Sequence, residues 1–316
     1  MGAGHTHGPR SASLTGWAWL SLATALVVMA LLYGAYLLTG SIGFLSDSLE
    51  SLVNVVAAII AIVALRAAER PADDKHPYGH GKAEYLSAGA EGLMILAAAA
   101  LIVYSAITRL IHPEPLESLG LGLALSAVAT LITLLVGVAI VRAGRRARSI
   151  ALEADGRHLL ADVLTSAGVL VGVALVAITG WQPLDSLVAL AVAVNIIIIG
   201  SGLVRRSLGG LLDRALPDDD RQAIETVLAE VRAKFPPGTV DFHDVQSREA
   251  GRDRFVRLHV LVPGDWTVQR GHDLLEDLEA RLESALPGVA VDTHLEPRED
   301  PRAYEHLAQD DVPHPH

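Results

Sequence analysis

Long apolar stretches dominate the first two thirds of the chain. Six of them are at least as long as the roughly 20 residues that a helix needs to cross a bilayer. They are residues 17–38, 42–65, 84–110, 119–141, 152–179 and 184–206. Polar residues interrupt the second, third and fifth stretches at regular spacing, whereas the others are almost entirely Leu, Ala, Val and Ile. The pattern predicts a membrane α-helical bundle of six transmembrane helices, with the interrupted helices lining its interior.

The positive charges predict how this bundle is oriented. Lys and Arg gather in the segments that follow the second, fourth and sixth stretches. The turns at 39–41, 111–118 and 180–183 contain neither residue. Under the positive-inside rule, both chain ends are then cytoplasmic. We therefore expect a multi-pass protein of the inner or plasma membrane, with the lipid bilayer as its solvent.

The pattern changes after the sixth stretch. Residues 219–234 and 267–286 have the spacing of amphipathic helices, and 240–247, 254–262 and 289–296 alternate as strands. The order αββαβ predicts a small cytoplasmic α+β domain of the ferredoxin-like kind. We accordingly divide the chain into a cytoplasmic tail (1–16), a transmembrane domain (17–208), a cytoplasmic domain (209–297) and a disordered tail (298–316).

Composition narrows the function. The 316 residues include no Cys, which excludes disulfides and thiolate metal sites. The net charge is −11, and residues 213–316 carry all of it, since they hold 12 Lys or Arg and 23 Asp or Glu (12 − 23 = −11). An acidic domain argues against nucleic acid as a partner and suits divalent cations.

Two of the interrupted stretches share one polar spacing, i, i+3 and i+7, which aligns three side chains on one helix face. These residues are Asp47, Glu50 and Asn54, and Asp155, His158 and Asp162. An ionisable group at bilayer depth costs roughly 2.5–3.5 kcal/mol on insertion scales, so such groups usually have a function. The alternative is that they only hydrogen bond one helix to another.

If the two helices face each other, four of these side chains can surround one divalent ion. This predicted transport site consists of Glu50, Asn54, His158 and Asp162. Asp47 and Asp155 lie one turn away and are accessory candidates, either supporting the ligands or lining the route to them. Glu91, in the third stretch, is a further acid that is either proton-linked or involved in helix packing.

Two further sets of residues could bind metal. In the loop 71-PADDKHPYGHGKAE-84, Asp73, His76 and His80 offer three ligands, and Pro77 and Gly79 favour the turn that would join them. The alternative is an ordinary polar loop. In the cytoplasmic domain, the candidates lie on strand faces away from the apolar residues, with scattered surface histidines as the alternative. They are His243, His259, His294 and Glu296, with His272 able to bridge from a helix.

Together these residues resemble the cation diffusion facilitator family over residues 15–297, in its zinc and iron(II) efflux branch. The family pattern H-x-x-x-D is present as His158 and Asp162, and D-x-x-H-x-x-x-H precedes 81-GKAE-84. The resemblance implies a homodimer with an ion pair between Lys82 and Asp213 at its interface. It also implies a regulatory two-metal site at the cytoplasmic histidines.

One feature departs from the family pattern. The second stretch usually has D-x-x-x-D or H-x-x-x-D, whereas this chain has Glu50 and Asn54. A neutral Asn removes one negative charge from the site. Zinc is the first choice of metal, and iron(II), cadmium, cobalt and manganese remain open because geometry and ligand type set selectivity.

The resemblance implies a transporter that exports a divalent metal from the cytoplasm in exchange for protons. Metal ions would be both its substrate and its regulator. The chain contains no HExxH or G-x-S-x-G string, so we do not expect an enzyme. The alternative is a membrane-bound metal sensor or metalloenzyme that does not transport.

Overall fold

The computed structural model describes residues 14–39, 42–111, 121–181 and 183–304. The chain divides into two compact units, a helical unit that ends at Leu211 and a C-terminal unit that begins at Leu212. The side chains of some residues within the helices, including Asp47 and Glu50, are not described. We consider the two units separately.

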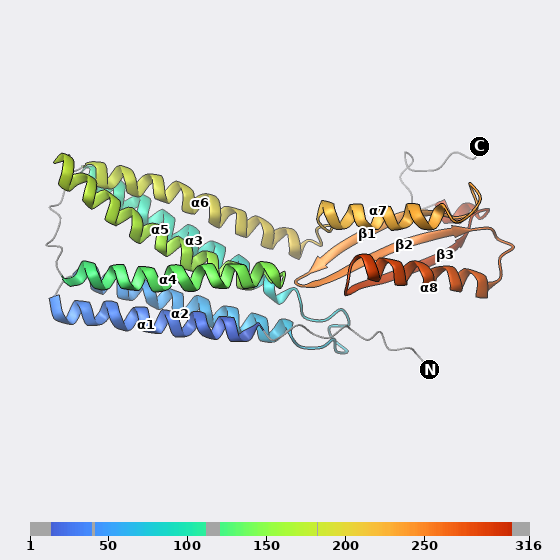
Figure 1. Cartoon of the computed structure of the whole chain (residues 1–316), viewed down its shortest axis with the longest axis horizontal. Coiled ribbons are helices and arrows are strands. Elements are labelled where there is room, and N and C mark those ends of the chain that lie inside the picture. Colours follow the sequence, from blue (N-terminus) through green and yellow to red (C-terminus); the bar gives the residue numbers. More distant parts are fainter. Residues whose placement is uncertain (1–13, 40–41, 112–120, 182, 305–316) are drawn as a thin grey trace. The chain divides into compact units, whose positions relative to one another are not determined.

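Six long helices form the described part of the helical unit (Figure 1). They are α1 (Thr15–Thr39), α2 (Ile42–Ala68), α3 (Ala83–Ile111), α4 (Leu121–Arg146), α5 (Ile150–Thr179) and α6 (Pro183–Leu211). Each overlaps one predicted stretch, which confirms the helical bundle. Among the described residues, five of these helices are long and apolar enough to cross a membrane. The exception is α5, whose first half carries Glu153, Asp155, Arg157 and Asp162.

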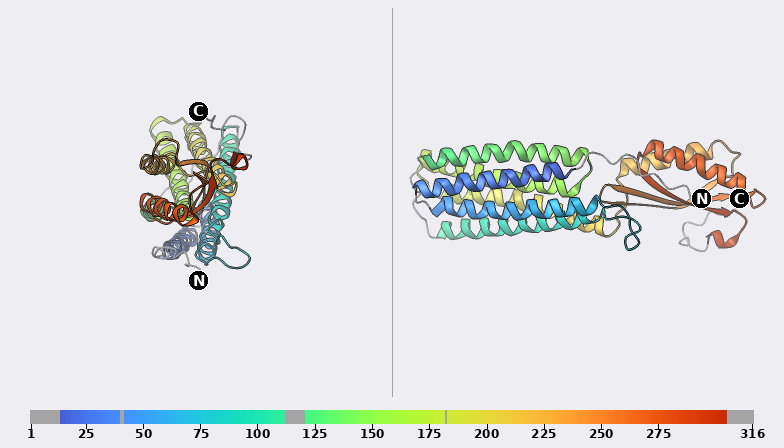
Figure 2. Two further views of the ribbon diagram at one scale, coloured as in Figure 1. Left: turned by 90° about the vertical axis from the view of Figure 1, so that its right-hand side faces the viewer. Right: turned by 90° about the horizontal axis from the view of Figure 1, so that it is seen from below.

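The helices run side by side along their length (Figure 2), and α5 contacts all five others. Glycines allow the closest approaches. A Cβ atom at Gly92 of α3 would lie 2.8 Å from Val204 Cγ2 of α6, and one at Gly156 of α5 would lie 2.8 Å from the Val141 backbone nitrogen of α4. Such distances leave no room for a side chain. Large apolar side chains on the outer surface, such as Leu101, are exposed and suit contact with lipid.

A charged network fixes the start of α5. The buried Glu153 accepts a hydrogen bond from Arg157 of the same helix at 2.7 Å and from Arg206 of α6 at 3.1 Å. Arg145 of α4 adds an ion pair at 3.4 Å. Because breaking a mostly buried pair leaves a charge uncompensated, the network holds three helices together at this end of the unit.

The C-terminal unit has the predicted element order. It contains α7 (Asp218–Arg232), β1 (Asp241–Ala250), β2 (Asp253–Val262), α8 (Val268–Ala285), β3 (Val289–Pro297) and a short 3-10 helix, η1 (Pro301–Tyr304). The described strands form one sheet in the order β1-β2-β3, with β1 antiparallel and β3 parallel to β2. The α+β prediction is therefore confirmed, and the ordered chain continues past the boundary that we expected at 297.

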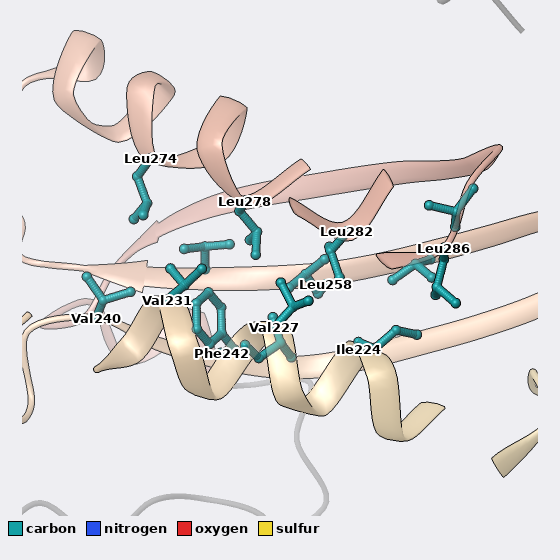
Figure 3. Packing of buried hydrophobic residues seen from close by; sticks show 14 of the residues in the cluster. Ile224, Val227, Val231, Val240, Phe242, Leu258, Leu274, Leu278, Leu282 and Leu286 are labelled. Carbon is teal, nitrogen blue, oxygen red and sulfur yellow. The ribbon is translucent and has the colours of Figure 1, made fainter. Parts of the chain in front are cut away.

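Both helices cover the same face of this sheet. Branched side chains of α7 and leucines of α8 point toward one another and toward the strands (Figure 3). The buried core positions of β2 alternate, and they are Val256, Leu258, Val260 and Val262. His259 therefore lies on the opposite face, which neither helix covers.

The pairing of β1 with β2 is irregular at one point. The register shifts between His243 and Gln246. Within this bulge Asp244 has a φ of 49°, in the left-handed region that non-glycine residues seldom adopt. A bulge interrupts the alternation of side chains, so Asp244 need not point away from the face that carries His243.

We expect Leu278→Ala to destabilise the C-terminal unit by about 2–5 kcal/mol, because it removes a fully buried side chain and leaves a cavity between α8 and the sheet. Hydrogen exchange of β2 peptides in the full-length protein should become faster. The control is Val268→Ala on the same helix, where the side chain is exposed. Equal exchange rates in both variants would show that Leu278 does not support this core.

Candidate functional site

An amide joins the two helices of the predicted transport site. Asn54 of α2 donates a hydrogen bond from Nδ2 to Asp162 Oδ2 at 2.6 Å, and its Oδ1 lies 2.8 Å from His158 Nε2. His158 and Asp162 are both on α5, four residues apart and thus on one helix face. The structure therefore brings together three of the four predicted ligands. The fourth, Glu50, and the accessory Asp47 lie outside the described side chains.

This arrangement is compatible with metal binding but needs rearrangement first. His158 and Asn54 are buried, and His158 Nδ1 has no hydrogen-bond partner among the described residues. The hydrogen bond places a proton on His158 Nε2 in this state, since an amide oxygen only accepts. A metal ion would replace the two amide hydrogen bonds and take an imidazole nitrogen, an amide oxygen and a carboxylate oxygen. Such a mixed set suits several divalent transition metals.

Two further acids are buried in the interior of the helical unit without joining this network. Asp155 accepts a hydrogen bond from Ser21 of α1 at 2.9 Å. Glu91 of α3 accepts one from Ser87, one turn earlier on its own helix, at 3.1 Å. Asp155 precedes His158 by three residues, so these acids form a separate layer about one turn away from the amide.

The loop between α2 and α3 gathers its three predicted ligands. Asp73 lies 3.2 Å from His76 Nδ1 and 3.6 Å from His80 Nε2, and the two imidazole rings are 4.3 Å apart. The backbone amide of His76 donates to Asp73 at 2.7 Å and lowers the pKa of this carboxyl group. Asp73 is therefore ionised and held in place by its own turn, as a metal ligand should be.

In the C-terminal unit, strand pairing creates a compact cluster of His243, His259 and Glu296. His259 of β2 pairs with His243 of β1 and with His294 of β3. Glu296 Oε2 lies 2.9 Å from His243 Nε2 and 3.3 Å from His259 Nδ1. One ligand atom from each of these three residues lies within 4.8 Å of the others. The donors converge closely enough for one ion.

The histidine cluster is more deeply buried than we expected for residues on a strand face away from the apolar core. His259 and Glu296 are buried, although they lie on the face away from the apolar core. On β1, the ring of Tyr304 from η1 stacks on His243 at 6.0 Å between ring centroids. By contrast, the His294 side chain is 65% exposed and lies 3.6 Å from Glu296. His294 is thus at the margin of the cluster.

Asp244 is a neighbour of the cluster that strand alternation does not predict. Its carboxylate lies 3.7 Å from His259 Nε2. In a regular strand, successive side chains point to opposite faces, so His243 and Asp244 would be separated. The bulge removes this separation. No signal in the sequence marks the bulge.

His272 does not join the cluster. It lies on α8, where its nearest acidic partner is Glu276, at 3.7 Å and one turn further along. A bridging role for His272 therefore has no support within the described chain.

The two members of the predicted interface pair have other partners within their own units. Lys82 Nζ donates to the carbonyl oxygen of Leu211 at 3.4 Å. Asp213 accepts from Arg248 at 3.0 Å. Lys82 thus contacts the last residue of the helical unit, whereas Asp213 is close to the residue at which the C-terminal unit begins. The ion pair between them stays a prediction.

Comparison with known proteins gives matches along nearly the whole chain. A family model described as the cation efflux transmembrane domain matches residues 18–212, and one described as the cation efflux protein cytoplasmic domain matches residues 216–298. An uncharacterized transporter of Synechocystis is 48% identical over 290 residues, which cover 92% of each chain. The cation-efflux pump FieF of Serratia proteamaculans is 35% identical and covers 87% of this chain and 90% of that protein.

A solved structure of CzrB in its zinc form also matches, with 33% identity, 27% of this chain and 92% of that chain covered, and a TM-score of 0.25. The relatives extend over both units in a single alignment, and the transmembrane match alone spans more than half of the sequence. The chain belongs to the cation efflux family, also called the cation diffusion facilitators, and is not an enzyme.

Proposed function

We propose that this cation efflux protein exports a divalent transition metal from the cytoplasm in exchange for protons. The observation that carries the proposal is the Asn54 amide, which bonds to both His158 and Asp162 across two helices. Hydrogen bonding between helices would require only one such contact. Three different donor groups meeting in the interior of a bundle are better explained as ligands.

Zinc is the metal that we propose first. Imidazole and carboxylate are common zinc ligands, and a neutral amide in place of a second acid keeps the charge of the site low. Iron(II), cobalt, manganese and cadmium are the alternatives. The relatives named as cation-efflux pumps support export as the direction of transport.

The proposed ligands also bind protons, which is why we expect metal and protons to exchange. Metal binding requires an unprotonated imidazole nitrogen and an ionised carboxylate, so protons and metal compete for His158 and Asp162. A histidine titrates in the range in which cell compartments differ in pH. A site that opens to a more acidic exterior would thus release metal and take up protons.

The C-terminal cluster is proposed as a regulatory site on the cytoplasmic side. The donor set of His243, His259 and Glu296 fits a divalent ion, since one ligand atom from each residue lies within 4.8 Å of the other two. The acidic C-terminal units of two subunits would repel each other. Bound cations would reduce this repulsion, which supports a metal-tightened homodimer with Lys82 and Asp213 at its interface.

The experiment that tests the whole proposal is a transport assay in liposomes. The purified protein is reconstituted with a pH gradient, and uptake is measured for a panel of divalent metals together with the internal pH. Metal flux coupled to an opposite proton flux is expected. Metal binding without flux would favour a sensor over a transporter.

Asp162→Ala should abolish transport while the protein still folds and assembles. Asp162 supplies the only carboxylate among the described ligands, and without it the described donors are both neutral. Flux into liposomes is the measurement, and size-exclusion chromatography reports assembly. Thr165→Ala, three residues further along α5, is the control that should keep flux, since the Thr165 hydroxyl donates to the carbonyl oxygen of Ala161 on the same helix. Normal flux in Asp162→Ala would contradict the site assignment.

Asn54→Asp should change metal preference or the pH dependence of transport rather than eliminate flux. The substitution keeps the size of the side chain but adds a negative charge that can compete for protons. The same liposome panel measures both properties. If the relative transport rates of the metals and the pH dependence of transport were both unchanged, Asn54 would not be a ligand.

Metal binding by the C-terminal unit should depend on His243 and His259. Replacing either by Ala in the full-length protein removes a ligand from the cluster, so calorimetric titration should show the loss of one class of metal sites. Transport itself should continue at an altered rate, since an ion held there has not crossed the membrane. Asp277→Ala, an acid on α8 that pairs with Lys234 and Arg281, is the control. Equal loss in this control would mean that general surface charge, not the cluster, binds the metal.

A further inference from the structure

Two buried carboxyl groups in the helical unit have no role in the proposed metal site. Glu91 of α3 is 0% exposed and Asp155 of α5 is 1% exposed. Each accepts one hydroxyl hydrogen bond, from Ser87 and Ser21 respectively. Glycines that follow both acids, Gly92 and Gly156, bring α6 and α4 against the same layer. Close packing of this kind excludes water from the two groups.

Each carboxyl group also has one oxygen that is unsatisfied. Glu91 Oε2 and Asp155 Oδ2 are buried and have no hydrogen-bond partner among the described residues. The two groups also lie at a similar level of the α3–α5 contact. Glu91 is seven residues after Glu84 and Asp155 is six residues after Ser149, and Glu84 and Ser149 are hydrogen bonded to each other. Residues on either side of both acids share one buried cluster, which includes Ala88, Ile95, Ala154 and Ala161. Two ionised carboxylates, each with one unsatisfied oxygen, would be very costly in this apolar interior, because no cationic side chain among the described residues pairs with them. The pair must therefore hold a cation, and the simplest cation is a proton.

Other titratable groups do not supply that charge. The helices that pack against α3 and α5 are α1, α2, α4 and α6. In α1 there is no acid or base apart from two tyrosines. Among the described side chains of the other helices and of α5 itself, none forms a hydrogen bond or ion pair with Glu91 or Asp155. The titratable side chains of α2, α4, α5 and α6 to which this applies are Arg66, Arg142, Arg145, Arg146, Glu153, Arg157, His158, Asp162, Arg205 and Arg206.

We propose that Glu91 and Asp155 form a proton-binding site that is separate from the metal ligands and that loses its proton when metal binds next to it. The inference rests on the proposed metal and proton exchange and adds a location for one of the protons. It concerns residues that touch no metal, so proton and metal need not compete for the same atom.

Helix geometry links this site to the metal. Asp155 precedes His158 by three residues, a rise of about 4.5 Å along α5. A divalent ion at His158 and Asp162 would favour the ionised form of an acid at that distance, because the interior screens charge weakly. Metal binding would thus expel the proton, and by reciprocity a proton on the pair would weaken metal binding.

The test compares Glu91→Gln and Asp155→Asn with the wild type, each as the full-length protein in detergent. An amide has the shape of a neutral carboxyl group, so these variants imitate the protonated state and should fold. Proton release on addition of zinc is measured in weakly buffered solution with a pH indicator. Zinc affinity and stoichiometry are measured by calorimetry over a range of pH.

Glu84→Gln is the matched control. Glu84 is equally buried on α3, two turns before Glu91, and accepts a hydrogen bond from Ser149 of α5 at 2.5 Å. It is a buried acid on the same helix, outside the proposed pair. We expect proton release per zinc to fall by about one in either pair variant and to be unchanged in Glu84→Gln. The slope of log affinity against pH should fall by about one as well.

Three outcomes would overturn the inference. The same proton count in the wild type and both pair variants would show that no coupled proton resides on these acids, while metal and proton exchange itself would stand. An equal fall in proton release per zinc in Glu84→Gln would show that the loss of any buried acid has this effect. The loss of one bound zinc in the pair variants would show that the pair holds metal. By contrast, no proton release in the wild type would refute the proposed exchange itself. If one pair variant is not recovered, the other tests the same site.

Discussion

A polar side chain buried between membrane-spanning helices can find a partner only inside the protein, because hydrocarbon offers none. This constraint explains the position of α5. It has more charged residues than any other of the long helices that the structure describes, and it contacts all five others. Its groups are met in turn by Arg206 and Arg145 at Glu153, by Ser21 at Asp155 and by Asn54 at His158 and Asp162. Because α5 supplies most of the buried polar groups, the helices around it can be largely apolar.

The constraint also separates two kinds of polar group along α5. Glu153 is compensated by arginines and serves to hold helices together. The groups further along have neutral partners, and two of them, Asp155 and His158, keep a buried atom without any partner among the described residues. A group that is fully satisfied by the protein has little reason to bind an ion. Along α5, incomplete satisfaction thus separates Asp155 and His158 from Glu153, which serves packing.

Much of this architecture follows from local sequence. The six helices follow from the length of their apolar stretches and the αββαβ unit from periodicity, and the i, i+4 spacing aligns His158 with Asp162. What the sequence does not reveal are choices made by tertiary packing. Asn54 could have paired with either residue and instead bonds to both. Asp244 reaches the histidine cluster through a bulge, and η1 places Tyr304 over it, in a segment whose composition suggested disorder.

The glycines at 92 and 156 have a consequence beyond packing. Each directly follows an acid in the sequence, at a point where two helices pack too closely for a side chain. Neither glycine has a side chain that could bind an ion, yet each allows a neighbouring helix to pack close beside a buried carboxyl group. In a survey of natural or engineered variants, enlarging either residue would therefore mimic damage to an ion-binding group.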